Sequence, residues 1–380
     1  MKTNKCLYLT FQPIAKADGV SKKVFAQKDA LNELGINTSI IYPKINDKYE
    51  YSFFLNDKLI IEKIKHSRIS SFIFSSSFYN SLFDVILQEK TTFLYIRYCL
   101  SACPVFLNFL KKCKKNGIKI FLEIATYPYD NEIKSYRAIP AKLIEKYYRK
   151  FLHNYIDRII TYTDLEYIYN IKTINISNAA PNSLPLRINK HEINSKIINL
   201  IVVANISLFH GIDRLIEGFK IFYEKKNEYE VFLNIVGESI ANKEAQKLRQ
   251  LVKLYNLEKY ICFCGPKDGY ELNELFNKSD LAIGCLGCHR KNISKLKSLK
   301  NVEYAVRGIP FIYSETNDDF DNQFYIKKFP ENEEAINVED ICHFIKNNTF
   351  NPQDIRNSIT HLTWNFQMNK ILSEFYKLNL

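Results

Sequence analysis

Residues 281–314 read LAIGCLGCHRKNISKLKSLKNVEYAVRGIPFIYS and contain the pattern that decides the fold. LAIGCLG is a short apolar run typical of a buried strand. Lys297–Val306 predicts a short helix, ended by Gly308 and Pro310 before a second strand, PFIYS. A helix that begins after a strand presents free N–H groups and a positive dipole end, which suit a phosphate. Glu303 in this helix either accepts hydrogen bonds from a sugar diol, such as a nucleotide ribose, or pairs with a lysine on the surface.

Strand-like runs and helical periods alternate along most of the rest of the chain, although residues 50–90 show no clear pattern. Such an order predicts parallel sheets covered by helices, the α/β class. Residues 179–196 contain two prolines and no apolar period, as in a linker. We therefore predict four parts: an N-terminal domain 1–178, the linker 179–196, a C-terminal domain 197–358 and a last helix 359–380.

Length and charge agree with two domains of different character. A chain of 380 residues exceeds the usual size of one hydrophobic core. Residues 1–180 contain 27 Lys and Arg against 16 Asp and Glu, whereas residues 181–380 contain 26 against 25. The basic half therefore suits an anionic partner, such as a lipid surface or a phosphorylated acceptor, unless the charge only serves solubility. No aromatic–basic motif for nucleic acid is present, so we expect no nucleic acid partner.

The helix expected at about 139–156 has a broad apolar face and several lysines. Such a helix either packs on a sheet, which we favour, or lies on anionic lipid. No secretory signal and no apolar stretch of about 18 residues is found. We expect a cytoplasmic protein, with a peripheral position on the inner face of the cell membrane as a further expectation.

Nine cysteines, an odd number, indicate a reducing compartment. Cys285, Cys288 and His289, with Cys262 and Cys264 upstream, could be drawn as a zinc site. The alternation of Cys262 and Cys264 along an apolar run instead predicts one buried face of a strand. We therefore expect no metal site.

Three further strand–loop–helix junctions would suit a phosphate. They lie at His210-Gly211, at Gly237-Glu238 and at Gly19-Val20-Ser21. None matches the glycine pattern of dinucleotide oxidoreductases or the phosphate loop of nucleoside triphosphatases, which disfavours those two classes.

Seven stretches occur in a characteristic order: 19–36, 121–130, 157–163, 171–178, 202–219, 235–239 and 281–314. In this order they resemble the retaining GT-B glycosyltransferases of family 4, also called glycosyltransferase group 1. Residues 281–314 are most similar to the subgroup that builds bacterial capsular and other surface polysaccharides. The resemblance implies two Rossmann-like domains facing each other across a cleft, with the last helix crossing back onto the N-terminal domain.

The resemblance also implies roles for individual residues. Glu303 matches the second of two donor-site glutamates and would bind the ribose, while Lys295 stands where the first glutamate is usual. The remaining roles are the donor diphosphate (Asn205, His210, Arg290, Lys300), the vicinity of the donor sugar and base (Gly237, Glu238, Lys295, Leu299), the glycine loop (Gly19, Val20, Ser21) and the acceptor side (Glu123, Tyr127, Asp130).

The implied activity is that of a hexosyltransferase. It would move a sugar, with retention, from a UDP- or GDP-linked donor to a polyprenyl-diphosphate-linked glycan in capsule, O-antigen or exopolysaccharide synthesis. No cofactor, no metal and no general base are expected, because the departing phosphate oxygen can take the acceptor proton. The alternatives are a nucleotide-sugar epimerase of the same fold, and a non-catalytic basic binding protein whose donor site has decayed.

Overall fold

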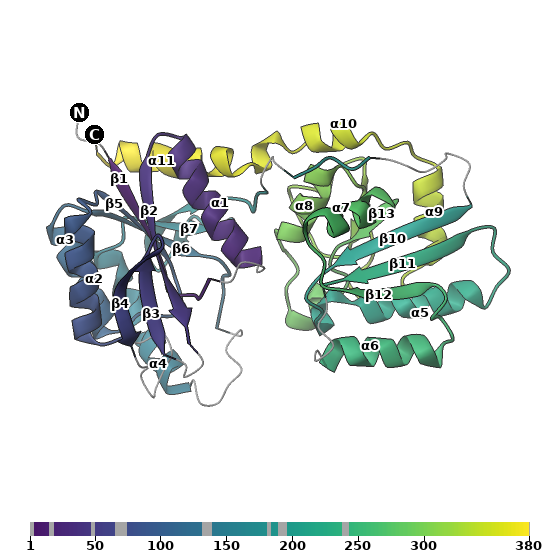
Figure 1. Cartoon of the computed structure of the whole chain (residues 1–380), viewed down its shortest axis with the longest axis horizontal. Helices are drawn as coiled ribbons and strands as arrows, with labels where there is room; N and C mark the ends of the chain where they lie inside the picture. Colours follow the sequence, from purple (N-terminus) through teal and green to yellow (C-terminus); the bar gives the residue numbers. More distant parts are fainter. Residues whose placement is uncertain are drawn as a thin grey trace. The chain divides into compact units, whose positions relative to one another are not determined.

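The computed structural model describes residues 4–14, 19–46, 50–64, 74–130, 139–180, 184–188, 196–237 and 243–379. The chain forms two compact units (Figure 1). Unit 1 comprises Met1–Ser177 and Trp364–Leu380, and unit 2 comprises Asn178–Thr363. Each unit has a largely parallel sheet with helices on its faces, which confirms the predicted pair of Rossmann-like domains. The last helix returns to unit 1, as the fold class predicts.

Unit 1 contains a nine-stranded sheet in the order β4-β3-β2-β1-β5-β6-β7-β9-β8. The six strands from β2 to β9 are parallel, and β3, β4 and β8 add antiparallel edges. Its elements are β1 (Lys5–Thr10), α1 (Gly19–Glu33), β2 (Asn37–Ile45), β3 (Tyr51–Leu55), β4 (Lys58–Ile64), α2 (Ser76–Gln88), β5 (Phe93–Arg97), α3 (Pro104–Lys115), β6 (Lys119–Ile124), α4 (Ile139–Tyr148), η2 (Arg149–Asn154), β7 (Arg158–Thr161), β8 (Tyr167–Ile168), β9 (Ile171–Asn175) and α11 (Trp364–Lys377).

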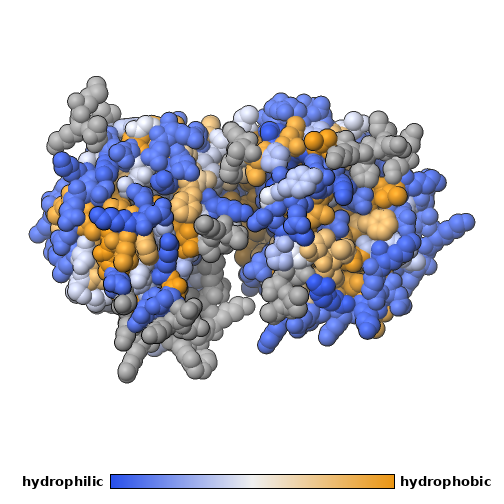
Figure 2. All heavy atoms as spheres, viewed as in Figure 1, coloured by the Kyte–Doolittle hydropathy of each residue, from blue (hydrophilic) through white to orange (hydrophobic). Residues whose placement is uncertain are grey.

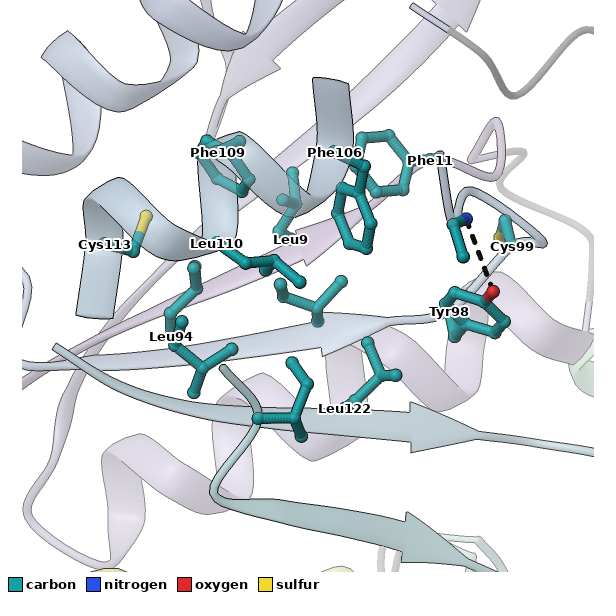
Figure 3. Packing of buried hydrophobic residues seen from close by; sticks show 14 of the residues in the cluster. Leu9, Phe11, Leu94, Tyr98, Cys99, Phe106, Phe109, Leu110, Cys113 and Leu122 are labelled. Atoms are coloured by element: carbon teal, nitrogen blue, oxygen red, sulfur yellow. Dashed lines mark hydrogen bonds between the residues drawn. The ribbon is translucent and has the colours of Figure 1, made fainter. Parts of the chain in front are cut away.

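Both faces of this sheet are covered, and its central strands β1, β5 and β6 are buried along almost their whole length. On one face, side chains of α3 such as Phe106 and Leu110 pack on Leu94 and Leu122 of the strands (Figure 3). Each such side chain contributes about 1.5–3 kcal/mol when fully buried. On the other face α1 packs against α11, and the ring of Phe375 stacks on Phe93 with centroids 4.7 Å apart.

Unit 2 contains a six-stranded parallel sheet in the order β12-β11-β10-β13-β14-β15. This is a doubly wound order. From β10, strands β11 and β12 are added on one side, and β13, β14 and β15 are then added on the other side. Its elements are β10 (Ile197–Val203), η3 (Leu208–His210), α5 (Ile212–Tyr223), β11 (Glu230–Val236), α6 (Lys243–Leu254), β12 (Ile261–Gly265), α7 (Gly269–Asn277), β13 (Leu281–Ile283), η4 (Cys288–Lys291), α8 (Leu299–Arg307), β14 (Phe311–Tyr313), β15 (Ile326–Lys328), α9 (Val338–Lys346), α10 (Pro352–Asn357) and η5 (Thr360–Leu362).

Two separate apolar clusters fill the two faces of the second sheet. One joins the strands to α5, α6 and α9 through residues such as Leu215, Leu248 and Ile341. The other joins them to α7, α8 and α10 through Phe276 and Ile355. The loops at the carboxyl ends of the strands are therefore held on a rigid base.

Some local expectations are wrong or incomplete. Residues 50–90, which show no clear pattern in the sequence, contain β3, β4 and α2. The helix expected at 139–156 ends at Tyr148 and continues as the 3-10 turn η2. Cys262 is exposed and not buried, because β12 is an edge strand of its sheet. The segment 179–196 belongs to unit 2 as far as it is described, and Ala180 bridges to Thr363.

The described surface is mostly hydrophilic. Figure 2 shows one face of the molecule, on which hydrophobic side chains appear as separate patches between charged and polar ones. Among the helices of the described ranges, none combines the length and the apolar character that crossing a bilayer requires.

Candidate functional site

The strongest candidate site lies in unit 2, where the order of the strands reverses between β10 and β13. In open parallel sheets, ligands bind in the crevice outside the carboxyl ends of the strands at this position. The loops that follow β10 and β13 are joined there by their backbones. The N–H groups of Leu286 and Gly287 donate to the carbonyl oxygens of His210 and Phe209 at 3.0 and 3.2 Å.

Gly211 allows this close approach. Its φ is +64°, and a Cβ atom at this position would lie 2.6 Å from the carbonyl carbon of Leu286. Only glycine combines this left-handed conformation with so little space. Helix α5 begins at the next residue, so its free N–H groups and positive dipole end lie at the crevice.

Gly237 brings the end of β11 to the same edge of the sheet. Its φ is +102°, and a Cβ atom would lie 2.9 Å from the carbonyl oxygen of Ala204, in the loop after β10. The predicted neighbour Glu238 lies outside the described residues.

His210 is buried and neutral. Its Nδ1 accepts the backbone N–H of Ser207 at 3.1 Å, which leaves the proton on Nε2. Burial, together with the positive charges of Lys300 and Lys291, lowers the pKa of His210 to about 2. The imidazole can therefore donate one hydrogen bond from Nε2 without carrying a charge of its own.

Lys300 and Lys291 supply the positive charge at this crevice. Both are near enough to His210 to lower its pKa, and Lys291 Nζ lies 3.9 Å from the centre of the Phe209 ring. The sequence predicted Lys300 but missed Lys291, which follows Arg290 in the turn η4. Asn205 is exposed in the loop after β10. An electropositive crevice with two loops in backbone contact suits the diphosphate of a nucleotide.

Arg290 has a different role from the predicted one. Its guanidinium group binds both carboxylate oxygens of Asp213 at 2.8 Å, the carboxylate of Glu333 at 2.5–3.1 Å and the carbonyl oxygen of Leu208 at 2.9 Å. Two carboxylates thus surround one cation. Arg290 holds the turn η4 against α5, and its charge is not available to a diphosphate.

Glu303 lies on α8, and the N-cap residue Ser298, just before this helix, makes no side-chain capping bond. Its Oε1 accepts from Arg307 Nε at 2.9 Å, and about a third of the side chain (32%) is exposed. Arg307 also donates to Asn273 and lies over the Phe276 ring. The observed partner of Glu303 is therefore an arginine one turn later on the same helix, while its carboxylate remains partly open to solvent.

Lys295 and Leu299 lie on either side of the start of α8. Lys295 Nζ pairs with Asp318 at 2.5 Å, and its backbone bridges to Thr316 in the loop after β14. Leu299 is the first residue of α8 and is half-buried. Lys295, which stands where the resemblance implies a glutamate, thus joins two loops of unit 2.

Glu123 in unit 1 is fully buried, so it cannot reach an acceptor as predicted. Its carboxylate accepts from Tyr95 Oη and Arg97 NH1 at 2.5 Å each, and it pairs with Lys23 at 3.3 Å. Gln27 and Tyr162 complete the network at 3.1 and 3.2 Å. Burial alone would raise the pKa of Glu123, but the two cations and these hydrogen bonds lower it to about 2.

Tyr127 and Asp130 lie in the loop after β6, away from the interior position of Glu123. The carboxylate of Asp130 binds Arg149 in a bidentate pair at 2.9 and 3.2 Å, and hydrogen bonding from Arg149 lowers the pKa of Asp130. The ring of Tyr127 lies 5.8 Å from that of Tyr169. This loop is therefore anchored to η2 and to the β8–β9 turn.

The predicted glycine loop forms the beginning of α1. Gly19 is exposed, Val20 is half-buried and Ser21 is buried. Residues 15–18, which precede them, lie outside the described ranges.

Helix α4 packs against the core of unit 1, the arrangement that we favoured, through the partly buried Ile144 and Tyr148. Glu145 is its only fully buried residue among those described, and it accepts a hydrogen bond from Tyr98 at 2.7 Å. Three apolar side chains spaced four residues apart are exposed: Ile139 (53%), Leu143 (62%) and Tyr147 (54%). Lys142, Lys146 and Lys150 follow the same spacing. We call these six residues the α4 stripe.

Comparison with known proteins supports the assignment of unit 2. Residues 186–317 match the family model described as Glycosyl transferases group 1. These residues are therefore similar to a group 1 glycosyl transferase domain. The domain includes the crevice between β10 and β13, with His210, Gly211, Lys291 and Lys300. No curated protein sequence matches the chain.

Solved structures match the whole chain in fold at low sequence identity. Sucrose-phosphate synthase from Thermosynechococcus elongatus has a TM-score of 0.68 at 12% identity, covering 99% of this chain and 100% of that one. A glycosyltransferase from Rickettsia africae has 0.65 at 14%, covering 99% of both chains. Anabaena HepE in complex with UDP has 0.60 at 10%, covering 97% and 99%. The likeness confirms the GT-B fold that the sequence predicts for the chain.

Proposed function

We propose that the chain is a retaining, metal-independent hexosyltransferase that uses a nucleotide-sugar donor. The observation that carries the proposal is the crevice at the β10–β13 reversal, within the domain that matches the group 1 family. Its lysines, its neutral histidine and its helix N-terminus suit a diphosphate. One structural neighbour, HepE, was solved with UDP and with UDP-glucose, and we take UDP or GDP as the expected bases here.

Each group in the proposed site has a distinct task. Lys291 and Lys300 balance the diphosphate charge, and His210 donates a hydrogen bond from Nε2. The N-terminus of α5 adds fixed dipoles, and the exposed Asn205 is a further candidate contact from the loop after β10. Glu303 would accept hydrogen bonds from the ribose diol if it turned from Arg307. Arg290 is left out of the diphosphate site, because two carboxylates already bind it.

The proposed reaction replaces one bond at the anomeric carbon. The bond from this carbon to the diphosphate oxygen breaks, and a bond to the acceptor hydroxyl oxygen forms on the same face of the sugar. The acceptor proton moves to the departing phosphate oxygen. The protein lowers the barrier chiefly by stabilising charge on that oxygen with groups that are already in place.

The proposed acceptor is a polyprenyl-diphosphate-linked glycan of bacterial surface polysaccharide synthesis, bound through unit 1. The α4 stripe supports contact with an anionic membrane. Its exposed apolar side chains can enter the acyl boundary while the exposed Lys146 and Lys150 meet anionic headgroups. Lys142 is half-buried and donates to the carbonyl oxygen of Asp130. Lys150 Nζ lies 4.2 Å from the Tyr147 ring centre, so charge and apolar surface are combined in one place.

The donor proposal is tested by thermal unfolding with UDP, GDP, CDP, dTDP and their common sugar conjugates, without added metal. A ligand at about 100 times its dissociation constant should stabilise the protein by about 2.7 kcal/mol. Glu303→Gln should weaken binding about 10- to 100-fold, because hydrogen bonds to a charged group are lost. Glu271→Gln, in another i,i+4 ion pair of unit 2, is the matched control and should bind normally.

The outcomes separate the alternatives. Stabilisation by one nucleotide that is weaker in Glu303→Gln supports the donor site. Stabilisation by none of them supports a binding protein with a decayed site. Formation of an epimer from the bound sugar nucleotide, with no acceptor present, would identify an epimerase and refute the transfer reaction.

The membrane proposal is tested by flotation with lipid vesicles. The chain should bind vesicles that contain phosphatidylglycerol and not those of phosphatidylcholine alone. Leu143→Ser should reduce binding about tenfold or more, as expected for an apolar side chain that becomes buried. Leu254→Ser, at a 71% exposed leucine of unit 2, should have no effect. Equal binding of both variants would refute a role for the α4 stripe.

A further inference from the structure

Two cysteines and one glutamate meet in the interior of unit 2. Cys285 and Cys288 lie on the turn after β13, and Glu315 lies two residues after β14. Their Sγ and carboxylate oxygen atoms are all within 4.8 Å of one another. The three side chains are buried, with exposed fractions of 1%, 0% and 0%. Within the described ranges, no other group of three cysteine, histidine or acidic side chains comes together in this way.

Glu315 lacks a partner for half of its carboxylate. Its Oε2 lies 3.8 Å from Cys288 Sγ, and its Oε1 has no hydrogen-bond partner among the described residues. A buried polar atom without a partner costs about 1–3 kcal/mol, and a charged one costs more. Folded proteins rarely keep such an atom unless a ligand, an ion or a water molecule binds it. A ligand between Glu315 and the two cysteines would satisfy this oxygen atom.

We propose that Cys285, Cys288 and Glu315 bind a zinc ion. Two thiolates and a carboxylate are ligands that zinc accepts, and two cysteines separated by two residues are a common half of a zinc site. A sulfur and an oxygen bound to one tetrahedral zinc ion are about 3.6 Å apart, given bond lengths of about 2.3 and 2.1 Å. The observed 3.8 Å between Cys288 Sγ and Glu315 Oε2 is close to this value.

Lys300 balances the charge of this site. Its Nζ lies 3.9 Å from Cys285 Sγ. Two thiolates and one carboxylate around a divalent ion leave one negative charge, which the lysine neutralises. The same lysine also contributes to the positive crevice beside His210. The ion would thus connect the turn after β13 to the end of β14, and it would help to fix the position of Lys300.

The chain contains a contrasting pair of thiols. Cys262 and Cys264 have their Sγ atoms 3.7 Å apart on the edge strand β12, but Cys262 is exposed. His289, which spacing alone would add to a zinc site, instead contacts Glu333 at 2.6 Å. The proposed ligand set therefore differs from the one that the cysteine spacing suggests. Because its three protein ligands are buried, the ion would hold the turn after β13 to the end of β14, and a water molecule would complete the tetrahedron.

The test measures zinc bound to the full chain. The protein is stripped with a chelator, incubated with Zn²⁺, desalted and analysed by mass spectrometry for metal content. The wild type should retain about one equivalent. Cys285→Ser and Cys288→Ser should each lose this zinc, and Glu315→Gln should bind it at least about tenfold more weakly. The double variant Cys262→Ser/Cys264→Ser is the control and should keep it.

A second measurement uses only the wild type, so its outcome does not depend on whether the variants fold. Addition of Co²⁺ to the stripped wild type should produce a thiolate-to-cobalt absorption and the intense visible bands of a tetrahedral site, and Zn²⁺ should remove both. Failure of the wild type to retain zinc or to give these bands would overturn the proposal, as would zinc retention by Cys285→Ser equal to that of the wild type. Neither readout depends on the transferase activity.

Discussion

Replacing Glu123 by glutamine should destabilise unit 1 strongly. Glutamine keeps the shape but leaves Arg97, which is 5% exposed, without its counter-ion. Lys23, which is 6% exposed, can instead lose its proton, because burial already lowers its pKa to about 7. Removing one partner of a buried ion pair costs about 3–5 kcal/mol. The pKa of Glu123 gives a similar figure. Its fall from 4.5 to about 2 corresponds to about 3 kcal/mol of preference for the carboxylate, at about 1.4 kcal/mol per pKa unit.

Trp364 makes the assay specific for unit 1. It is the only tryptophan of the chain, it is 4% exposed, and Lys23 Nζ lies 5.6 Å from its ring centre. Urea unfolding followed by tryptophan fluorescence therefore reports on unit 1, even if the two units unfold separately. Protection by nucleotide reports independently on unit 2. The variant should shift the first signal and leave the second unchanged.

Two comparisons strengthen this test. Glu33→Gln changes an exposed glutamate of α1 and should alter the free energy of unfolding by less than about 0.5 kcal/mol. In the double variant Glu123→Gln/Arg97→Met, the arginine that has lost its counter-ion is removed, so part of the loss should be recovered. Because the pKa of Glu123 is lowered on folding, its contribution is complete above pH 4.5 and is lost as the pH falls towards 2.

The structural role of Glu123 would be refuted by one result. If Glu123→Gln unfolds at the same urea concentration as the wild type while the KM for the acceptor rises, the carboxylate contacts acceptor and is not an internal counter-ion.

Two shorter predictions concern unit 2. Burial lowers the pKa of His210 to about 2 in the folded protein, so below pH 6.5 this histidine binds a proton only in the unfolded chain. The free energy of unfolding therefore falls by at most about 1.4 kcal/mol for each pH unit below 6.5. His210→Asn should remove that component in urea titrations between pH 4.5 and 7.5, and an unchanged slope would contradict the burial argument. Replacing glycine by alanine within a helix usually stabilises the protein by about 0.5–1 kcal/mol. Gly218→Ala in α5 should instead lower the free energy of unfolding by about 1–3 kcal/mol, because the new Cβ atom would lie 1.9 Å from the carbonyl oxygen of Ile336. A higher melting temperature would contradict this.

The sequence was sufficient to predict features of the fold that depend on residues close together in the chain. Helix α8 begins within two residues of its predicted start, and it ends at Gly308 because this residue adopts a φ of +73° before the strand at Phe311. The His210-Gly211 junction was found for the same reason, since a strand, a glycine and an apolar helical period follow one another directly. The order of such local signals is what made the GT-B fold predictable.

Features that depend on distant partners could not be predicted. Arg290 is bound by Asp213, 77 positions away, and nothing near Arg290 in the sequence reveals that pairing. Glu123 and Arg97 are adjacent only because β5 and β6 pair in register. Cys262 follows the alternation of a half-buried strand, but the alternation does not show that β12 lies at the edge of its sheet. Lys291 reaches the crevice through a turn that ends at Asn292 in the left-handed conformation, which carries no residue pattern of its own.

The return of α11 to unit 1 has a consequence for synthesis on the ribosome. The strands of unit 1 are made first, but the helix that packs on Phe93 follows only after all of unit 2, residues 178–363. At about 5–20 residues per second, this interval lasts roughly 10–40 s. During that time the nascent first unit exposes an apolar sheet face to chaperones and to neighbouring chains. A deletion that removes α11 therefore acts on the half of the protein that was translated first and leaves the sequence of unit 2 intact.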